Sequence, residues 1–190
     1  NALHSTTSAA GNTAIGYSSL SANTTGPSNT AVGFQSLTAN IAGNSNTGIG
    51  YQAMLAETSG QWNTAVGAYS LIAITTSSFN TAVGMYALTA ATSGDRNTGI
   101  GDQALSSTTT GAQNVAVGMW SMLHATTGTG SVTVGYDAMD SNAVGNYNTG
   151  LGYQAVFSNS SGSHNTGVGY RTLYLSRLSS GNVAVGDSAL

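Results

Sequence analysis

Hydrophobic and polar positions repeat along this chain with a strict period of 17 residues. The segment Asn12–Gly16 (Asn-Thr-Ala-Ile-Gly) returns without insertion or deletion in eleven copies, and we number each copy from position 1 at its Asn. The copies begin at residues 12, 29, 46, 63, 80, 97, 114, 131, 148, 165 and 182. A fixed period of this length is typical of repeat architectures, so we expect residues 1–190 to form a single repeat array.

Two positions are apolar in every copy, position 4 and position 9. Two are too few for a pair of helices, which needs apolar stripes at 3.6-residue spacing. We therefore expect both columns to form the core of a β structure. At position 4 the candidate core residues are Ile15, Val32, Ile49, Val66, Val83, Ile100, Val117, Val134, Leu151, Val168 and Val185. At position 9 they are Leu20, Leu37, Met54, Leu71, Leu88, Leu105, Met122, Met139, Val156 and Leu173.

The remaining positions predict two short strands and two turns per copy. β-Branched residues at positions 2 and 4 favour one strand, and a second is expected around positions 7 to 10. Positions 11 to 17, with Gly at position 15 in most copies, predict a turn. Position 5 is Gly in every copy, which predicts another turn at Gly16, Gly33, Gly50, Gly67, Gly84, Gly101, Gly118, Gly135, Gly152, Gly169 and Gly186. The predicted fold is all-β, a parallel β-solenoid (β-roll) of about eleven 17-residue coils.

Stacked coils explain why the period never varies. Each coil pairs its backbone with its neighbours at a spacing of ~4.8 Å, so eleven coils give a rod on the order of 50 Å long. Asn at position 1 in ten of eleven copies predicts a ladder of side-chain amides along the rod. No terminal cap is visible, so we expect the chain to be a segment of a longer fibre, or its ends to be covered by other molecules.

Composition narrows the choice of function. The chain has three Lys and Arg, six Asp and Glu, three His, no Cys and a net charge of −3. The absence of Cys excludes disulfides and Cys nucleophiles, and so few cations could not neutralise a nucleic acid. No apolar run approaches the ~18 residues that a membrane span needs, and no signal peptide is visible.

Catalytic chemistry is not expected. The acidic residues are Glu57, Asp95, Asp102, Asp137, Asp140 and Asp187. They are expected to be solvated surface charges, and no spacing suggests a catalytic pair. The histidines His4, His124 and His164 lie several coils apart, too far to share a metal. No Ser is expected near both a His and a carboxylate. We therefore expect neither an enzyme nor a cofactor.

The repeat resembles a known family. The pattern Asn-Thr-Ala-Val-Gly-(Tyr/Phe)-Gln-(Ala/Ser)-Leu, followed by a turn of the Asn-Thr-Thr-Gly type, resembles repeats of phage tail fibres. It is also similar to head repeats of YadA-like trimeric autotransporter adhesins, whose motif is Ser-Val-Ala-Ile-Gly; residues 114–118 and 182–186 come nearest. The resemblance implies a left-handed β-roll, a side-by-side homotrimer, and positions 2 and 4 pointing inward. The period is longer here, and Thr replaces Val at most copies of position 2.

Two further columns leave alternatives open. Aromatic residues at position 6 would pack between chains or stack on sugars; they are Tyr17, Phe34, Tyr51, Tyr136, Tyr153 and Tyr170. Thr at position 2 would face inward, or would present a flat array like that of ice-binding proteins.

We expect a structural fibre shaft or adhesive head, extracellular or on a virion tail. Its expected partners are copies of itself and possible surface glycans or a host receptor. The alternatives are a filament of end-to-end stacked coils and, third, an ice-binding solenoid.

Overall fold

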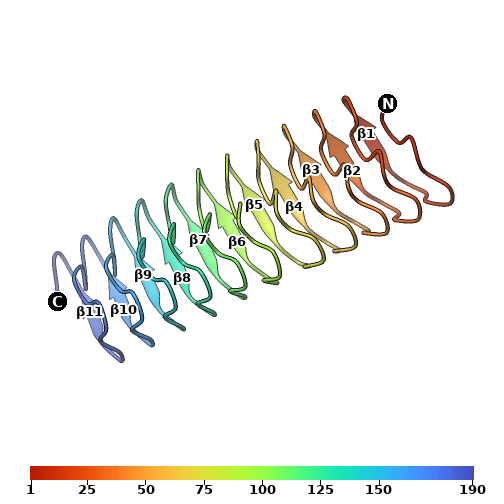
Figure 1. Cartoon of the computed structure of the whole chain (residues 1–190). Coiled ribbons are helices and arrows are strands. Elements are labelled where there is room, and N and C mark those ends of the chain that lie inside the picture. Colours follow the sequence, from red (N-terminus) through yellow and green to blue (C-terminus); the bar gives the residue numbers. More distant parts are fainter.

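The chain is a rod of stacked coils. The computed structural model describes all 190 residues and contains strands, turns and loops but no helix. The two termini lie at opposite ends of the rod, because each coil advances the chain by one step in the same direction (Figure 1). Each complete coil contributes one strand, and the fold is therefore an all-β parallel β-solenoid, as the repeat predicted.

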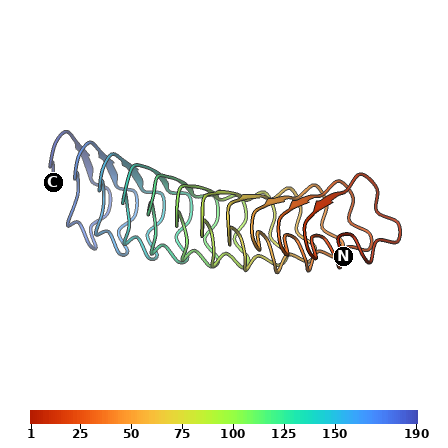
Figure 2. The same ribbon diagram turned by 90° about the horizontal axis from the view of Figure 1, so that it is seen from above.

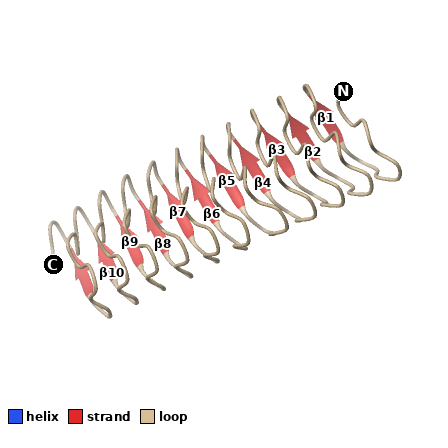
Figure 3. Ribbon diagram, in the orientation of Figure 1, coloured by secondary structure: helices blue, strands red, loops and turns tan.

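The strands occupy positions 2 to 4 of each copy and lie in one row along one side of the rod (Figures 2 and 3). They are β1 (Thr13–Ile15), β2 (Thr30–Val32), β3 (Thr47–Ile49), β4 (Thr64–Val66), β5 (Thr81–Val83), β6 (Thr98–Ile100), β7 (Val115–Val117), β8 (Val132–Val134), β9 (Thr149–Leu151), β10 (Thr166–Val168) and β11 (Val183–Val185). All are parallel and pair in the order β1 to β11. Thr13 pairs with Thr30, one period later, so every column stays on one face.

The second strand predicted around positions 7 to 10 is absent. This segment consists of turns, because its backbone repeatedly enters the left-handed region, with φ of 55° at Gln35 and 50° at Leu37. It is nevertheless hydrogen-bonded between coils, since the Leu37 N–H donates to the carbonyl of Ala53 at 3.0 Å. Of 120 backbone hydrogen bonds, 100 lie outside the strands, so turns and loops hold most of the stack together.

Of the two apolar columns predicted to form the core, only one is buried. Position 9 is buried from Leu20 to Leu173 as predicted, but none of the position-4 residues is buried. The strand instead turns position 3 inward, where Ala, Gly or, in β8, Thr133 joins the position-9 side chains in the interior. The roll is narrow: a Cβ on Gly48 would lie 3.2 Å from the Leu37 Cγ. The aliphatic side chains at position 4 therefore face outward. The position-4 residues corrected in this way are Ile15, Val32, Ile49, Val66, Val83, Ile100, Val117, Val134, Leu151, Val168 and Val185.

The Asn column is a ladder, but it bonds mainly to the backbone. The Asn46 N–H donates to Asn29 Oδ1 at 2.9 Å, and the Asn46 side-chain amide donates to the carbonyl of Gly60 at 2.8 Å. Ser131 replaces Asn without breaking the ladder, because its hydroxyl accepts the N–H of Asn148 at 3.1 Å. Each rung thus satisfies buried polar groups of the next coil.

Candidate functional site

The outward face of the sheet is the most regular surface of the molecule. Position 2 presents Thr or Val and position 4 presents an aliphatic side chain, on eleven strands in register. In the interior of the rod, Ile49 is 39% exposed and Val134 is 43% exposed. Neither column contains a charged residue. We name positions 2 and 4 of all copies the outward stripe.

Thr at position 2 lies on this stripe and does not point into the roll. Thr47, Thr64 and Thr81 are half-buried, while the residues that follow them, at position 3, are fully or almost fully buried. This follows from the strand's alternation, since positions 2 and 4 share the face opposite to position 3. The inward orientation implied by the family resemblance is therefore wrong for both positions.

The aromatic column at position 6 lies next to the outward stripe along the chain. Tyr17, Phe34 and Tyr51 stack with centroids 5.3 Å apart and interplanar angles of 15° and 6°. A second stack joins Tyr136, Tyr153 and Tyr170 at 5.5 and 5.4 Å. The inner ring of each stack meets another ring on both faces. Sugar stacking uses exposed ring faces, so this geometry favours packing over sugar binding.

Other aromatic residues extend these stacks. Tyr69 and Tyr86 at position 7 stack at 5.0 Å, and Tyr69 meets Tyr51 edge-on at 5.2 Å, so rings continue past the gap in position 6 at Ala68. Sequence reasoning missed a further pair at position 10, Phe157 and Tyr174, which stack at 5.1 Å. That column is chemically mixed, so the only available signal was two aromatic residues 17 apart.

One group of polar side chains comes together against expectation. The His124 Nδ1 lies 3.0 Å from Asp140 Oδ1, and the Ser141 hydroxyl donates to Asp140 Oδ2 at 3.1 Å. Asp140 is 7% exposed, so it is not the solvated charge we expected. Burial raises the pKa of the Asp140 carboxyl, and His124 and Ser141 oppose that rise. The Ser hydroxyl points to the carboxylate rather than to the His, so this group lacks the order of a nucleophilic triad.

Glu57 is the second acidic residue that the prediction misplaced. It is fully buried, and its Oε1 accepts the N–H of Gly60. Burial raises the pKa of this carboxyl to about 7, opposed by backbone hydrogen bonds from Gly60, Ser59 and Thr58. Asp95, Asp102 and Asp137 are partly exposed, and Asp187 is exposed.

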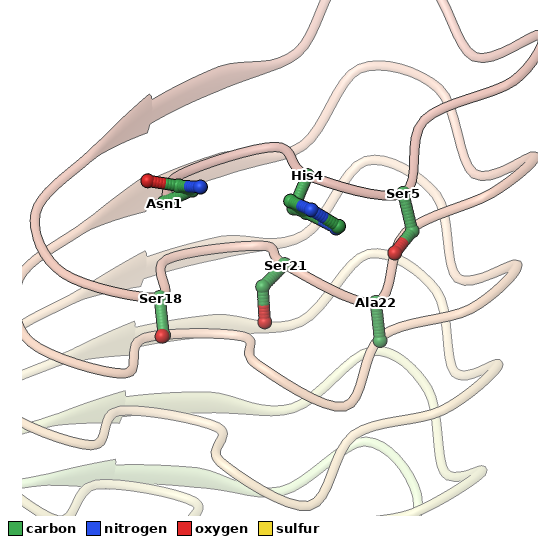
Figure 4. A pocket seen from close by; sticks show the side chains of 6 residues that line it. All are labelled: Asn1, His4, Ser5, Ser18, Ser21 and Ala22. Atoms are coloured by element: carbon green, nitrogen blue, oxygen red, sulfur yellow. The ribbon is translucent and has the colours of Figure 1, made fainter.

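None of the hollows on the surface is lined by an Asp or Glu side chain. The hollow in Figure 4 lies between the first two passes of the chain, and its lining contains no carboxylate; it consists of Asn1, His4, Ser5, Ser18, Ser21 and Ala22. No three His, Asp or Glu side chains lie close enough together to hold a metal ion. No helix is present that would be long and apolar enough to cross a membrane.

Known proteins add no direct information on function. No protein-family model matches the chain. No curated protein matches it either, and neither does any solved structure. The choice of the outward stripe and the adjacent aromatic column as the candidate functional surface therefore depends on their geometry alone.

Proposed function

We propose that this chain is a segment of a non-catalytic structural fibre whose copies associate side by side through the outward stripe. The proposal includes the trimeric arrangement and left-handed coil that the family resemblance implies. It also includes a location outside a cell or on a virion tail, where a stiff rod holds or presents an adhesive surface to glycans or a host receptor.

The main support for lateral association is the exposed aliphatic column at position 4. It runs the length of the rod without a charge, and residues such as Ile49 and Ile100 are each 39% exposed. Monomeric soluble proteins rarely expose a continuous apolar patch of more than a few hundred Å². Burial against a second surface of equal period would remove this patch from water.

A second copy of the same chain is the occupant that fits best. Its columns have the same 17-residue period, so every coil meets an equivalent coil without loss of register. Positions 2 to 6 span at most ~13 Å and the rod on the order of 50 Å, which gives roughly 650 Å² per copy. Standard stable interfaces bury about 800 Å² per partner, so the stripe with its aromatic column is close to sufficient.

The test is the mass of residues 1–190 in solution. A trimer of the 18.9 kDa chain is expected at tens of micromolar by sedimentation equilibrium. The double variant Val83→Asp, Val117→Asp places two carboxylates on the stripe and should yield monomers, because each would be buried unpaired. The matched control Thr110→Asp, Thr127→Asp adds the same charge at the exposed position 14 and should remain trimeric. A wild-type monomer would overturn the proposal, and a mass that grows without limit would favour end-to-end filaments.

A second candidate function is favoured by the outward orientation of Thr. Eight copies carry Thr at position 2, on a parallel sheet whose strands pair in register, which resembles the surface of ice-binding proteins. Ice adsorption requires the stripe to be free, whereas lateral association buries it. Thermal hysteresis measured on the same wild-type and variant samples separates the two functions, because only ice binding predicts hysteresis in the wild type and its loss in the stripe variant.

A further inference from the structure

Position 12 forms a buried column in which one residue is ionisable. Glu57 is 0% exposed and lies in register between Asn40 of the preceding coil and Ile74 of the next, both of them also fully buried. Side chains of neighbouring coils touch where this column holds Asn, because the Asn40 side-chain amide donates to Asn23 Oδ1 at 3.3 Å. A carboxyl group is thus enclosed by the stack itself.

Three buried side-chain oxygen atoms of this column lack a donor, and two of them, Glu57 Oε2 and Asn40 Oδ1, lie in neighbouring coils; the third is Asn159 Oδ1. Glu57 Oε1 accepts the N–H of Gly60, but Glu57 Oε2 has no partner. Asn40 Oδ1 also has no partner. The Asn40 side-chain N–H groups donate to the Gly43 carbonyl and to Asn23 Oδ1. An unsatisfied buried acceptor costs free energy, and two in neighbouring coils are unusual. Protonation turns Glu57 Oε2 from an acceptor into a donor, and Asn40 Oδ1 is the unpartnered acceptor of the preceding coil.

Nothing near Glu57 compensates a negative charge. Residues 5–94 contain no other Asp, Glu, Lys, Arg or His. The backbone of residues 58–60 donates hydrogen bonds to the carboxyl, and the residues in register in the adjacent coils are Asn40 and Ile74; none of these groups titrates. Burial raises the pKa of this carboxyl to about 7, although the backbone hydrogen bonds favour the ionised form.

We propose that Glu57 is protonated in the folded rod and donates its proton to Asn40 Oδ1, which makes this junction between two coils a pH-sensitive joint. The folded pKa lies above the ordinary value of 4.5, so the stabilisation is complete below pH 4.5 and is lost as the pH rises through 7. Full ionisation raises the unfolding equilibrium constant by roughly 300-fold. Copies with Asn at position 12 have no group that could titrate there.

A direct test uses the fact that Glu57 is the single glutamate in the chain. Labelling with glutamate carrying ¹³C at Cδ therefore gives one carboxyl resonance, whose pH titration in the folded protein reports Glu57 alone. A midpoint near 7 is expected. A midpoint between 4 and 5, the range of a solvated carboxyl, would overturn the proposal. The variant Asn40→Ala removes the proposed acceptor and should lower the midpoint; an unchanged midpoint would exclude Asn40 from the bond.

A second test measures stability with two neutral substitutions. Glu57→Gln keeps the shape and a permanent donor, and Glu57→Asn copies the residue that occupies position 12 at Asn23, Asn40, Asn142 and Asn159. Urea unfolding between pH 5 and pH 8.5 should show a fall in wild-type stability that both variants lack. Equal pH dependence in all three proteins contradicts the joint. The labelling experiment needs only the wild type, so it decides the matter even if a variant fails to fold.

Discussion

The column at position 9 and the column at position 4 are equally apolar in sequence but lie on opposite sides of the coil wall. Leu88 at position 9 is fully buried, whereas Val83 at position 4, five residues earlier, is only half-buried on the outward face. The inner column packs against Ala82 and its equivalents at position 3. The outer column meets no other part of the chain that would cover it.

This difference separates two kinds of stability. Position 9 stabilises the single coil stack, because its side chains leave water when one chain folds. Position 4 contributes less to that process, because its side chains stay partly in water; the proposed association would bury them against a second copy. Apolar residues at position 9 would then serve the folding of one chain, and those at position 4 its association. Substitutions at each position distinguish the two roles.

The largest effect is expected at the boundary between the two columns, where position 5 turns the chain. Gly84 has a φ of +132°, and a Cβ there would lie 2.4 Å from the carbonyl oxygen of Gly101. Gly84→Ala should therefore lower the free energy of unfolding by about 4 kcal/mol or more, combining backbone strain with a backbone clash. Urea denaturation followed by circular dichroism measures the change.

The matched control is Gly11→Ala at position 17. Gly11 has a φ of +73°, but the nearest atom to its added Cβ is the Ser28 hydroxyl at 3.6 Å, so no clash occurs. A cost of about 1 kcal/mol is expected from the left-handed backbone alone. Equal losses at Gly11 and Gly84 would show that the close approach of successive coils is unimportant.

The next effect compares the two columns directly. Leu88→Ala should cost about 3 kcal/mol, because it opens a cavity in the closed core. Val83→Ala should cost less than about 1 kcal/mol in chains kept monomeric by dilution, since its side chain is already partly in water. Under conditions of association, Val83→Ala should weaken the assembly. Similar losses for both variants in the monomer would refute the inward and outward assignment.

Sequence reasoning identified the β-solenoid, the strand at positions 2 to 4, the glycine turns and the Asn ladder, because each depends on one kind of residue repeated in register. It misplaced the face of position 4, since a three-residue strand such as Thr81–Val83 alternates equally well in either direction. The narrow space inside the roll, where a Cβ on Gly99 would lie 3.4 Å from the Leu88 Cγ, accommodates the small residue of position 3. The burial of Glu57 was also missed, because no other copy has an acid at position 12.

The prediction of a second strand at positions 7 to 10 failed for a different reason. Leu and Gln favour right-handed or extended backbone, so nothing in the composition of positions 7 and 9 indicates the left-handed conformations found at Gln35 and Leu37. Those conformations accompany the closing of a coil in 17 residues while this segment still donates hydrogen bonds to the next coil, as Leu37 does to Ala53. Conformation here is imposed by the stack and not by local preference.

The smallest expected effect tests this imposed backbone, on which the placement of both columns depends. Ser28 is exposed, has a φ of +61°, and shares position 17 with Gly11, Gly130 and Gly181. Ser28→Gly relieves the left-handed strain but raises the entropy of the unfolded chain, so the free energy of unfolding should change by less than about 0.5 kcal/mol. Ser28→Val adds a β-branched side chain to the same backbone and should cost about 1 to 2 kcal/mol. Urea midpoints resolve the two variants, and a Val variant as stable as the Gly variant would mean that position 17 leaves the left-handed region in solution. Because neither substitution touches the inner core or the outward stripe, any difference between them reports the backbone alone.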